Sequence, residues 1–133
     1  MNKKNGTLLL AATMITVLNF HSCKKYDDGP SFTLRSKKGR LTGEWELVKL
    51  DGQSITGYDI EWEFEKDGDF SQSYSYSSSS YSYSGEWEFS SDKEEIEIQM
   101  NGSSSSTDFE IKRLTNKELT VEYDGDEWEF EKI

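Results

Sequence analysis

Strict alternation of apolar and polar side chains beyond Leu41 limits this chain more than any other feature. A period of two residues is that of a β-strand with one buried face, and no stretch has a helical period of useful length. The pattern therefore predicts an all-β domain over residues 41–133. Eight strands are expected, at 44–50, 60–65, 69–77, 81–89, 94–100, 108–113, 118–123 and 127–132.

Short connections between these runs predict antiparallel hairpins whose register keeps the apolar faces together. A three-residue loop that ends at Gly68 sets Phe64 against Phe70. Eight such strands can stack as two sheets or close on themselves, and closure removes the exposed edges. We expect an eight-stranded antiparallel up-and-down barrel. The other expected pairs are Ile60–Tyr74, Tyr76–Tyr81, Tyr74–Tyr83, Phe70–Trp87, Phe89–Ile96, Met100–Phe109, Ile111–Leu119 and Tyr123–Trp128.

The first strand begins with Leu-Thr-Gly-Glu-Trp at residues 41–45. This resembles the Gly-x-Trp signature of lipocalins and the wider calycin group, and the domain is similar to small lipocalin-like lipoproteins of Bacteroidota. The resemblance implies that Trp45 packs across the closed base of the barrel. It also implies a basic cover from the last strands, for which Arg113 and Lys132 are the candidates. The Thr-Asp-Tyr motif, C-terminal helix and disulfide of larger lipocalins are absent.

Loop lengths give the expected barrel a polarity. The connections 51–59, 77–80, 101–107 and 124–126 share one end and include the longest and most serine-rich loops, so this end is the expected mouth. Aromatic rings there can contact an apolar ligand while their polar atoms meet water or a ligand oxygen. The candidate ligand-binding residues are Trp62, Tyr74, Tyr76, Tyr81, Tyr83, Tyr123 and Trp128.

A barrel of this size is either filled by its own side chains or keeps one small cavity. The first case leaves a filled module that contacts a protein or a glycan through its exterior, and the second leaves a site for a small hydrophobic or amphipathic ligand. Residues 71–84 hold nine serines, four tyrosines and one glutamine, a surface that can also stack on sugars. The sequence leaves both functions open.

The N-terminus has the order of an export signal. Two lysines precede an apolar run at 7–20 that is too short to span a bilayer. Ser22-Cys23 at its end resembles the lipobox of bacterial lipoproteins, which implies cleavage after residue 22 and acylation of Cys23. An ordinary secretory signal with an incidental cysteine is the alternative.

Residues 23–40 are interpreted as the lipidated cysteine and a basic tether. Lys24–Asp28 resembles the short signal that sends Bacteroidota lipoproteins to the outer face of the outer membrane, and a periplasmic face is the alternative. Residues 24–40 carry a net charge of +4 and residues 41–133 a net charge of −17. A basic segment suits anionic headgroups, whereas the acidic body repels nucleic-acid phosphate. We expect a monomer.

Catalysis is not expected. His21 and Cys23, the only histidine and cysteine, fall in the signal and the anchor, so the mature domain has no imidazole or free thiol. The glutamates of the strands alternate outward, where a carboxyl keeps an ordinary pKa. Asp67-Gly68-Asp69 and Asp124-Gly125-Asp126 have turn chemistry and do not complete a calcium loop. No enzyme, metal site or cofactor is predicted.

Overall fold

The computed structural model describes residues 35–133, so the expected signal and the anchor at Cys23 lie outside the described residues. All eight expected strands are present, with ends within two residues of the prediction. A two-residue strand in the 51–59 connection and one short helix add to them. The elements are α1 (Lys37–Leu41), β1 (Gly43–Leu50), β2 (Gln53–Ser54), β3 (Tyr58–Phe64), β4 (Asp69–Tyr76), β5 (Ser79–Phe89), β6 (Glu95–Met100), β7 (Thr107–Leu114), β8 (Glu118–Tyr123) and β9 (Asp126–Lys132).

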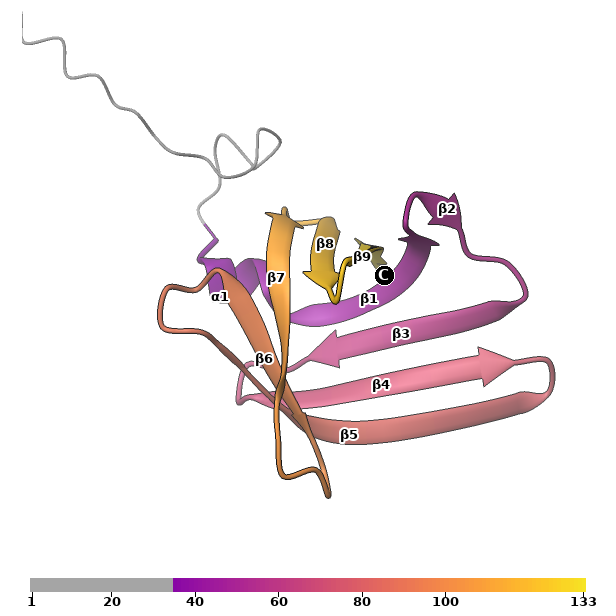
Figure 1. The fold of residues 1–133 in the computed structure, drawn as a ribbon, viewed down its shortest axis with the longest axis horizontal. Helices are drawn as coiled ribbons and strands as arrows, with labels where there is room; N and C mark the ends of the chain where they lie inside the picture. The colour runs from indigo at the N-terminus through magenta and orange to yellow at the C-terminus, as the bar shows by residue number, and fades with distance from the viewer. Residues whose placement is uncertain (1–34) are drawn as a thin grey trace, which may run out of the picture.

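The strands form one antiparallel sheet that closes on itself. Neighbours in the sheet follow chain order, and β1 also pairs with β9, with Leu47 opposite Phe130 and Leu50 opposite Trp128. The short β2 pairs with the end of β1. Figure 1 shows β1, β3, β4 and β5 as long neighbouring strands, with β6 and β7 crossing beside them and β8 and β9 behind. The predicted eight-stranded barrel, closed by its first and last strands, is confirmed.

One face of the sheet supplies the core. No polar or charged residue among the described residues is buried, so the acidic side chains face outward as predicted. The buried hydrophobic residues come from α1 and every long strand, which makes the barrel interior a single core. They are Leu41, Trp45, Leu47, Trp62, Phe64, Phe70, Trp87, Ile96, Ile98, Phe109, Ile111, Leu114, Leu119, Val121 and Phe130.

Helix α1 lies at one end of the barrel. The Ser36 side chain caps it by accepting a hydrogen bond from the Gly39 N–H at 3.0 Å. Leu41 is fully buried, and its carbonyl accepts a hydrogen bond from Trp45 Nε1 at 2.8 Å. Residues 37–40, which the sequence analysis assigned to the tether, therefore belong to the folded domain. Among residues 35–133 there is no helix of the length and apolarity needed to cross a membrane.

Several expected registers are wrong by an even number of residues. Phe64–Phe70, Ile60–Tyr74 and Phe89–Ile96 pair as predicted. Between β4 and β5, however, Tyr74 lies opposite Tyr81. The reason is a tighter turn, in which Ser77 adopts a positive φ of 54°. The other corrected pairs are Tyr76–Ser79, Gln72–Tyr83, Phe70–Gly85, Ile96–Phe109, Ile111–Val121, Leu114–Leu119, Val121–Trp128 and Tyr123–Asp126.

Strand β5 takes part in two different portions of the sheet. Its pairing with β4 runs from Ser79 to Glu86, whereas its pairing with β6 begins only at Gly85, opposite Met100. A Cβ on Gly85 would lie 2.3 Å from the Gln99 carbonyl oxygen, so only glycine lets β6 approach this closely. Before Gly85, over residues 79–84, β5 is not paired with β6, and this first half of β5 continues with β3 and β4 (Figure 1).

Candidate functional site

The middle of the barrel is filled by aromatic rings. Trp62 is 2% exposed, and its ring centre lies 4.5 Å from that of Phe130 and 5.0 Å from that of Phe109. Phe64, Phe70 and Trp128 complete the cluster at 6.0, 5.6 and 5.8 Å. Trp62 was predicted to line a ligand site, but its ring is a core residue beneath the mouth, and solvent does not reach it.

The remaining predicted site residues form what we call the aromatic rim: Tyr74, Tyr76, Tyr81, Tyr83, Tyr123 and Trp128. Solvent reaches 57% of Tyr76, 54% each of Tyr81 and Tyr83, and 43% of Tyr123. Tyr74 and Trp128 are half-buried. Tyrosine rings with this exposure are not packed into the core. The mouth is therefore lined by rings that a ligand can touch directly.

Ring contacts occur on two sides of the rim, and on one of them they reach the core. On the β4–β5 side Tyr74 stacks on Tyr81, with their ring centres 6.5 Å apart. On the other side Phe109 lies 5.2 Å from Tyr123 and 6.2 Å from Trp128. Among residues 35–133 no pair of rings joins the two sides across the mouth. The rim thus offers two aromatic walls above one packed floor.

Sequence reasoning missed two residues of this end. Tyr58 lies 5.8 Å from Tyr74 between ring centres, and Gln72 is the cross-strand partner of both Trp62 and Tyr83. The alternation could have found them, because residues two apart on a strand share a face. Tyr58 is two residues before Ile60, and Gln72 is two residues after Phe70. Gln72 adds an amide, which can donate and accept hydrogen bonds, between the rim and the core.

Two buried indole N–H groups lack an acceptor. Neither Trp62 Nε1 nor Trp128 Nε1 has a hydrogen-bond partner in the described structure. The other two tryptophans are satisfied, since Trp45 Nε1 donates to Leu41 and Trp87 Nε1 donates to the Glu65 carbonyl, each at 2.8 Å. A buried donor without a partner costs about 1–3 kcal/mol. The unsatisfied pair lies where the floor meets the rim, with ring centres 5.8 Å apart.

Surface hollows occur on the outer side of the strands. One of about 400 Å³ is lined by Glu65, Asp69, Glu86, Ser84 and Asn101, together with Phe70, Ser71 and Gly85. Another, of about 180 Å³, is lined mainly by glutamates and serines of β1, β3, β4 and β5. Both are polar. Neither involves the exposed tyrosines of the rim, so these hollows are separate from it.

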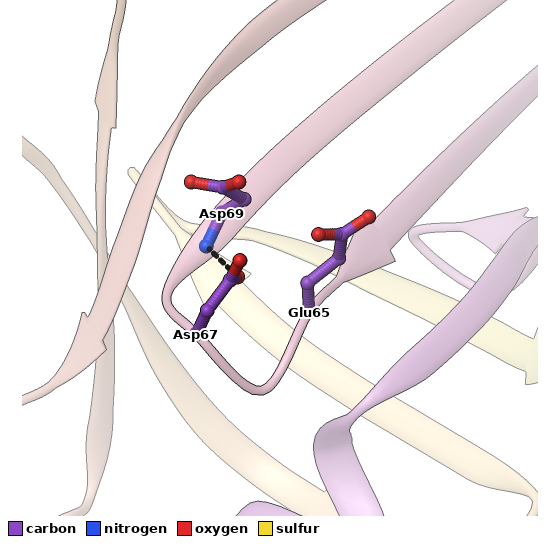
Figure 2. A group of neighbouring side chains, drawn as sticks. All are labelled: Glu65, Asp67 and Asp69. Carbon is purple, nitrogen blue, oxygen red and sulfur yellow. Dashed lines mark hydrogen bonds between the residues drawn. The ribbon is translucent and has the colours of Figure 1, made fainter.

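Three carboxylates gather at the β3–β4 turn. Glu65, Asp67 and Asp69 are exposed, and Figure 2 shows their side chains around the turn, with the Asp69 N–H donating to Asp67 Oδ1 at 3.0 Å. The charge of Asp67, followed by partial desolvation, raises the pKa of Glu65 above its ordinary value. The predicted turn role of the Asp67–Asp69 segment is confirmed. The cluster has the geometry of a solvated turn held together by one Asx hydrogen bond.

The base of the barrel has the arrangement that the Gly-x-Trp signature implies. Trp45 is fully buried, and Lys132 Nζ lies 4.9 Å from its ring centre. Of the two basic candidates, Lys132 is therefore the cover, whereas Arg113 forms a 2.5 Å ion pair with Glu118. A closed antiparallel barrel with a tryptophan across its closed base and an open opposite end defines the protein as lipocalin-like.

Comparison with known proteins places the chain in a family. The sequence model of the lipocalin-like domain matches residues 41–121, and the protein belongs to this family. A comparison with curated proteins found no match.

Solved structures of similar fold come from Bacteroides. A lipocalin-like protein from Bacteroides uniformis superposes with a TM-score of 0.62 at 19% identity, covering 71% of this chain and all of the other. A protein from Bacteroides eggerthii gives 0.59 at 22% identity, covering 70% and 99%. An NMR structure of a protein from Bacteroides uniformis gives 0.55 at 19% identity, covering 71% and 90%. These likenesses support the fold.

Proposed function

We propose that this protein is a lipid-anchored, non-enzymatic binding protein that holds a small amphipathic molecule against the aromatic rim. The exposure of Tyr76, Tyr81 and Tyr83, each more than half accessible on a closed barrel, is the observation that carries the proposal. Tyrosine offers a flat apolar ring at low conformational cost and a hydroxyl that can meet water or a ligand oxygen. A rim built on paired strands holds such rings in fixed positions.

The packed floor sets the size and depth of the ligand. Because Trp62 and Phe130 fill the barrel centre, the ligand lies in the mouth and is not enclosed. Trp128 belongs to both the rim and the floor, because its half-buried ring lies 5.8 Å from that of Trp62 between ring centres. A ligand that reaches past Trp128 gains apolar contact with the core. One that stays outside contacts the tyrosines alone.

The polar atoms of this end favour a ligand with acceptor oxygens. The indole N–H groups of Trp62 and Trp128 lack acceptors, and a carbonyl, ether or hydroxyl oxygen placed beside Trp128 would supply one. The net charge of −17 over residues 41–133 repels an anionic head group. The favoured ligand is therefore neutral or cationic, with one flat or apolar portion.

Native mass spectrometry of protein purified from its own host is the first test, because a copurified molecule would reveal the ligand class. A titration with the neutral dye Nile red tests the location. We expect dye fluorescence to rise on the parent and to fall in the double variant Tyr81→Ser/Tyr83→Ser. The matched control is Ser75→Ala on the outer face of β4, which should bind as the parent does. Equal dye binding by the double variant and the parent would exclude the rim as the binding site.

Contact with a protein or glycan at the cell surface is the second candidate. The observation that favours it is the composition of residues 71–84, which are uncharged and rich in serine and tyrosine on an otherwise acidic domain. Such a surface can stack on sugar rings and adapt its hydroxyls to their oxygens. If soluble oligosaccharides shift the NMR signals of Tyr76, Tyr81 and Tyr83 while no small molecule copurifies, this candidate replaces the first.

Membrane attachment through acylated Cys23 completes the proposal. Its support is the charged, apolar and Ser22-Cys23 order of the N-terminus and the basic residues that follow. Several acyl chains on one cysteine hold a protein stably on a bilayer. Labelled palmitate should enter the parent and not the Cys23→Ser variant, which should leave the outer-membrane fraction. Protease treatment of intact cells distinguishes the exterior from the periplasmic face.

A further inference from the structure

The outer edge of β5 is open along residues 79–84. This segment pairs with β4 on one side, while β6 joins β5 only from Gly85 onward. Among residues 35–133 no strand pairs with the other side of this segment. In Figure 1 this edge of the β3–β4–β5 extension faces away from the rest of the sheet.

The open edge follows from how β5 and β6 separate. At their last contact Asn101 N–H donates to the Ser84 carbonyl at 2.9 Å, so the backbone of Ser84 faces away from β4. Backbone groups alternate sides along an antiparallel strand, so those of Ser80 and Ser82 face the same way. Two N–H groups and two carbonyls therefore point outward without a strand to receive them.

This edge also lacks the usual protection against added strands. Natural edges are blocked by charged side chains, proline or bulges. Residues 71–84 contain no charge and no proline, and the β4–β5 register is regular from end to end. Alternating tyrosine and serine have a high strand propensity on one face and small side chains on the other. The edge is thus suited to pairing with another strand.

An acidic hollow lies where the open edge meets β6. Ser84, Gly85 and Asn101 line the hollow of about 400 Å³, and its carboxylates come from Glu65, Asp69 and Glu86. Its serines and acids lie on the outer face, the face toward which an added strand would direct every second side chain. A lysine or arginine at the end of that strand would reach these carboxylates.

We propose that the β5 edge receives an extended segment of a partner protein, uncharged along its length and basic at the end beside Glu86. Backbone hydrogen bonds to Ser80 and Ser82 provide affinity, and the acidic hollow selects the basic end. A second copy of this chain fits less well, because each folded body carries a net charge of −17. This site is formed by backbone groups and is distinct from the ring surface of the aromatic rim.

Amide hydrogen exchange followed by NMR tests the proposal on the intact protein. The probe is the peptide Lys-Lys-Thr-Val-Thr-Val-Thr, and the control is the same peptide with two glutamates in place of the lysines. Without peptide, the Ser80 and Ser82 amides should exchange faster than those of Tyr81 and Tyr83, which face β4. The lysine peptide should slow exchange at both serines, and the glutamate peptide should have little effect. Unchanged exchange at saturating lysine peptide would overturn the proposal.

Matched variants separate the edge from other surfaces. Ser82→Pro removes an outward N–H without touching a bond to β4, and we expect affinity for the lysine peptide to fall about fivefold to tenfold. Ser82→Thr keeps the N–H and should bind as the parent does. Glu86→Gln should reduce the difference in affinity between the lysine peptide and the glutamate peptide. Equal affinity in the proline variant, or protection of Ser80 and Ser82 by self-association alone, would contradict a partner segment.

Discussion

Lys132, the last residue of β9, lies across Trp45 of β1, with Nζ 4.9 Å from the ring centre. The same ammonium donates to the Arg40 carbonyl at 2.9 Å. Burial, followed by the charge of Arg35, lowers the pKa of Lys132 below its ordinary value. One side chain therefore joins the last strand, the first strand and helix α1.

Replacing Lys132 should weaken the base. Lys132→Ala removes the cation over Trp45, the hydrogen bond to Arg40 and the apolar stem, and we expect a loss of about 1–2 kcal/mol in the free energy of unfolding. Lys132→Met keeps most of the stem and should lose less. Urea unfolding followed by tryptophan fluorescence measures both. A methionine variant as unstable as the alanine variant would show that the apolar stem contributes nothing and that the whole loss comes from the ammonium.

Gly43→Ala should be more harmful than a change of one methyl group at a half-buried position suggests. Gly43 has a φ of +133°, and a Cβ there would lie 2.7 Å from Lys132 Cε. We expect a loss of about 1–3 kcal/mol, which the added change Lys132→Ala should not fully restore because the backbone strain remains. Gly102→Ala is the control, since it also has positive φ but has open space around it. Full rescue by Lys132→Ala would assign the whole effect to the steric contact.

Removing the closing strand should unfold the domain. Deletion of residues 127–133 removes the β9 partner of both β1 and β8, and it removes Phe130 from contact with Trp62. We expect loss of the cooperative thermal transition and of near-ultraviolet circular dichroism. Deleting Ser104 and Ser105 from the exposed β6–β7 loop is the control and should leave the transition in place. A strand-deleted chain that melts like the parent would contradict closure.

Trp62→Ala should be among the most damaging single changes. Its ring contacts five other aromatic rings and is almost fully buried, so the change leaves a large cavity in the core. We expect a loss of about 3–5 kcal/mol by chemical denaturation. Tyr83→Ala, on the rim, should change stability far less because most of its ring is already exposed. Comparable losses at both positions would contradict the division into floor and rim.

Stability should rise as the pH falls from 7 toward the range just above the ordinary carboxyl pKa. A shared hydrogen bond with Asp51, and the charge of Asp51, raise the pKa of Asp126 from its ordinary value of 3.8. The folded state then binds this proton more tightly than the unfolded state, so stability increases as the pH falls through the raised pKa and decreases as it rises. Glu65 and Glu97 act in the same direction.

Melting temperatures measured between pH 7 and pH 5 test the sign of this effect. Asp126→Asn should raise the melting temperature at pH 7, because the amide can donate to Asp51 without a charge, and should flatten the dependence on pH. Lys49→Gln on the outer face of β1 is the control, because Lys49 is not among the groups that shift the pKa of Asp126. If the parent protein becomes less stable as the pH falls from 7 to 5, other titrating groups determine the pH dependence of its stability.

The alternation of apolar and polar residues predicted which face of each strand is buried. It predicted the register between neighbouring strands less reliably. A shift of two residues keeps every side chain on its face, so the pattern alone accepts Tyr74 opposite either Tyr81 or Tyr83. The turn decides between them. Gly68 marks its turn by residue type, and the Phe64–Phe70 pair is as predicted. Ser77 gives no such signal, because a serine with positive φ is uncommon.

The helix at the base and the separation of β5 from β6 were beyond the sequence pattern. Residues 37–41 are too few to show a helical period, and the Ser36 cap is the only local signal. Gly85 reads as one more inward position of a strand, and its need for glycine depends on the backbone of Gln99, which comes from another strand. The rim residues were found from the sequence because exposure at the mouth follows from loop placement, whereas the filled floor depends on how five rings fit around Trp62.

The absence of a side chain at Gly85 divides the domain into a closed portion and an appended ribbon. The tryptophan base and the pairing of the first and last strands lie in the closed portion. Residues 71–84 therefore contribute little to the stability of the fold. Substitutions there should change the exposed tyrosine and serine surface with little effect on whether the domain folds. A different sequence could therefore be grafted between Phe70 and Gly85 onto the same barrel.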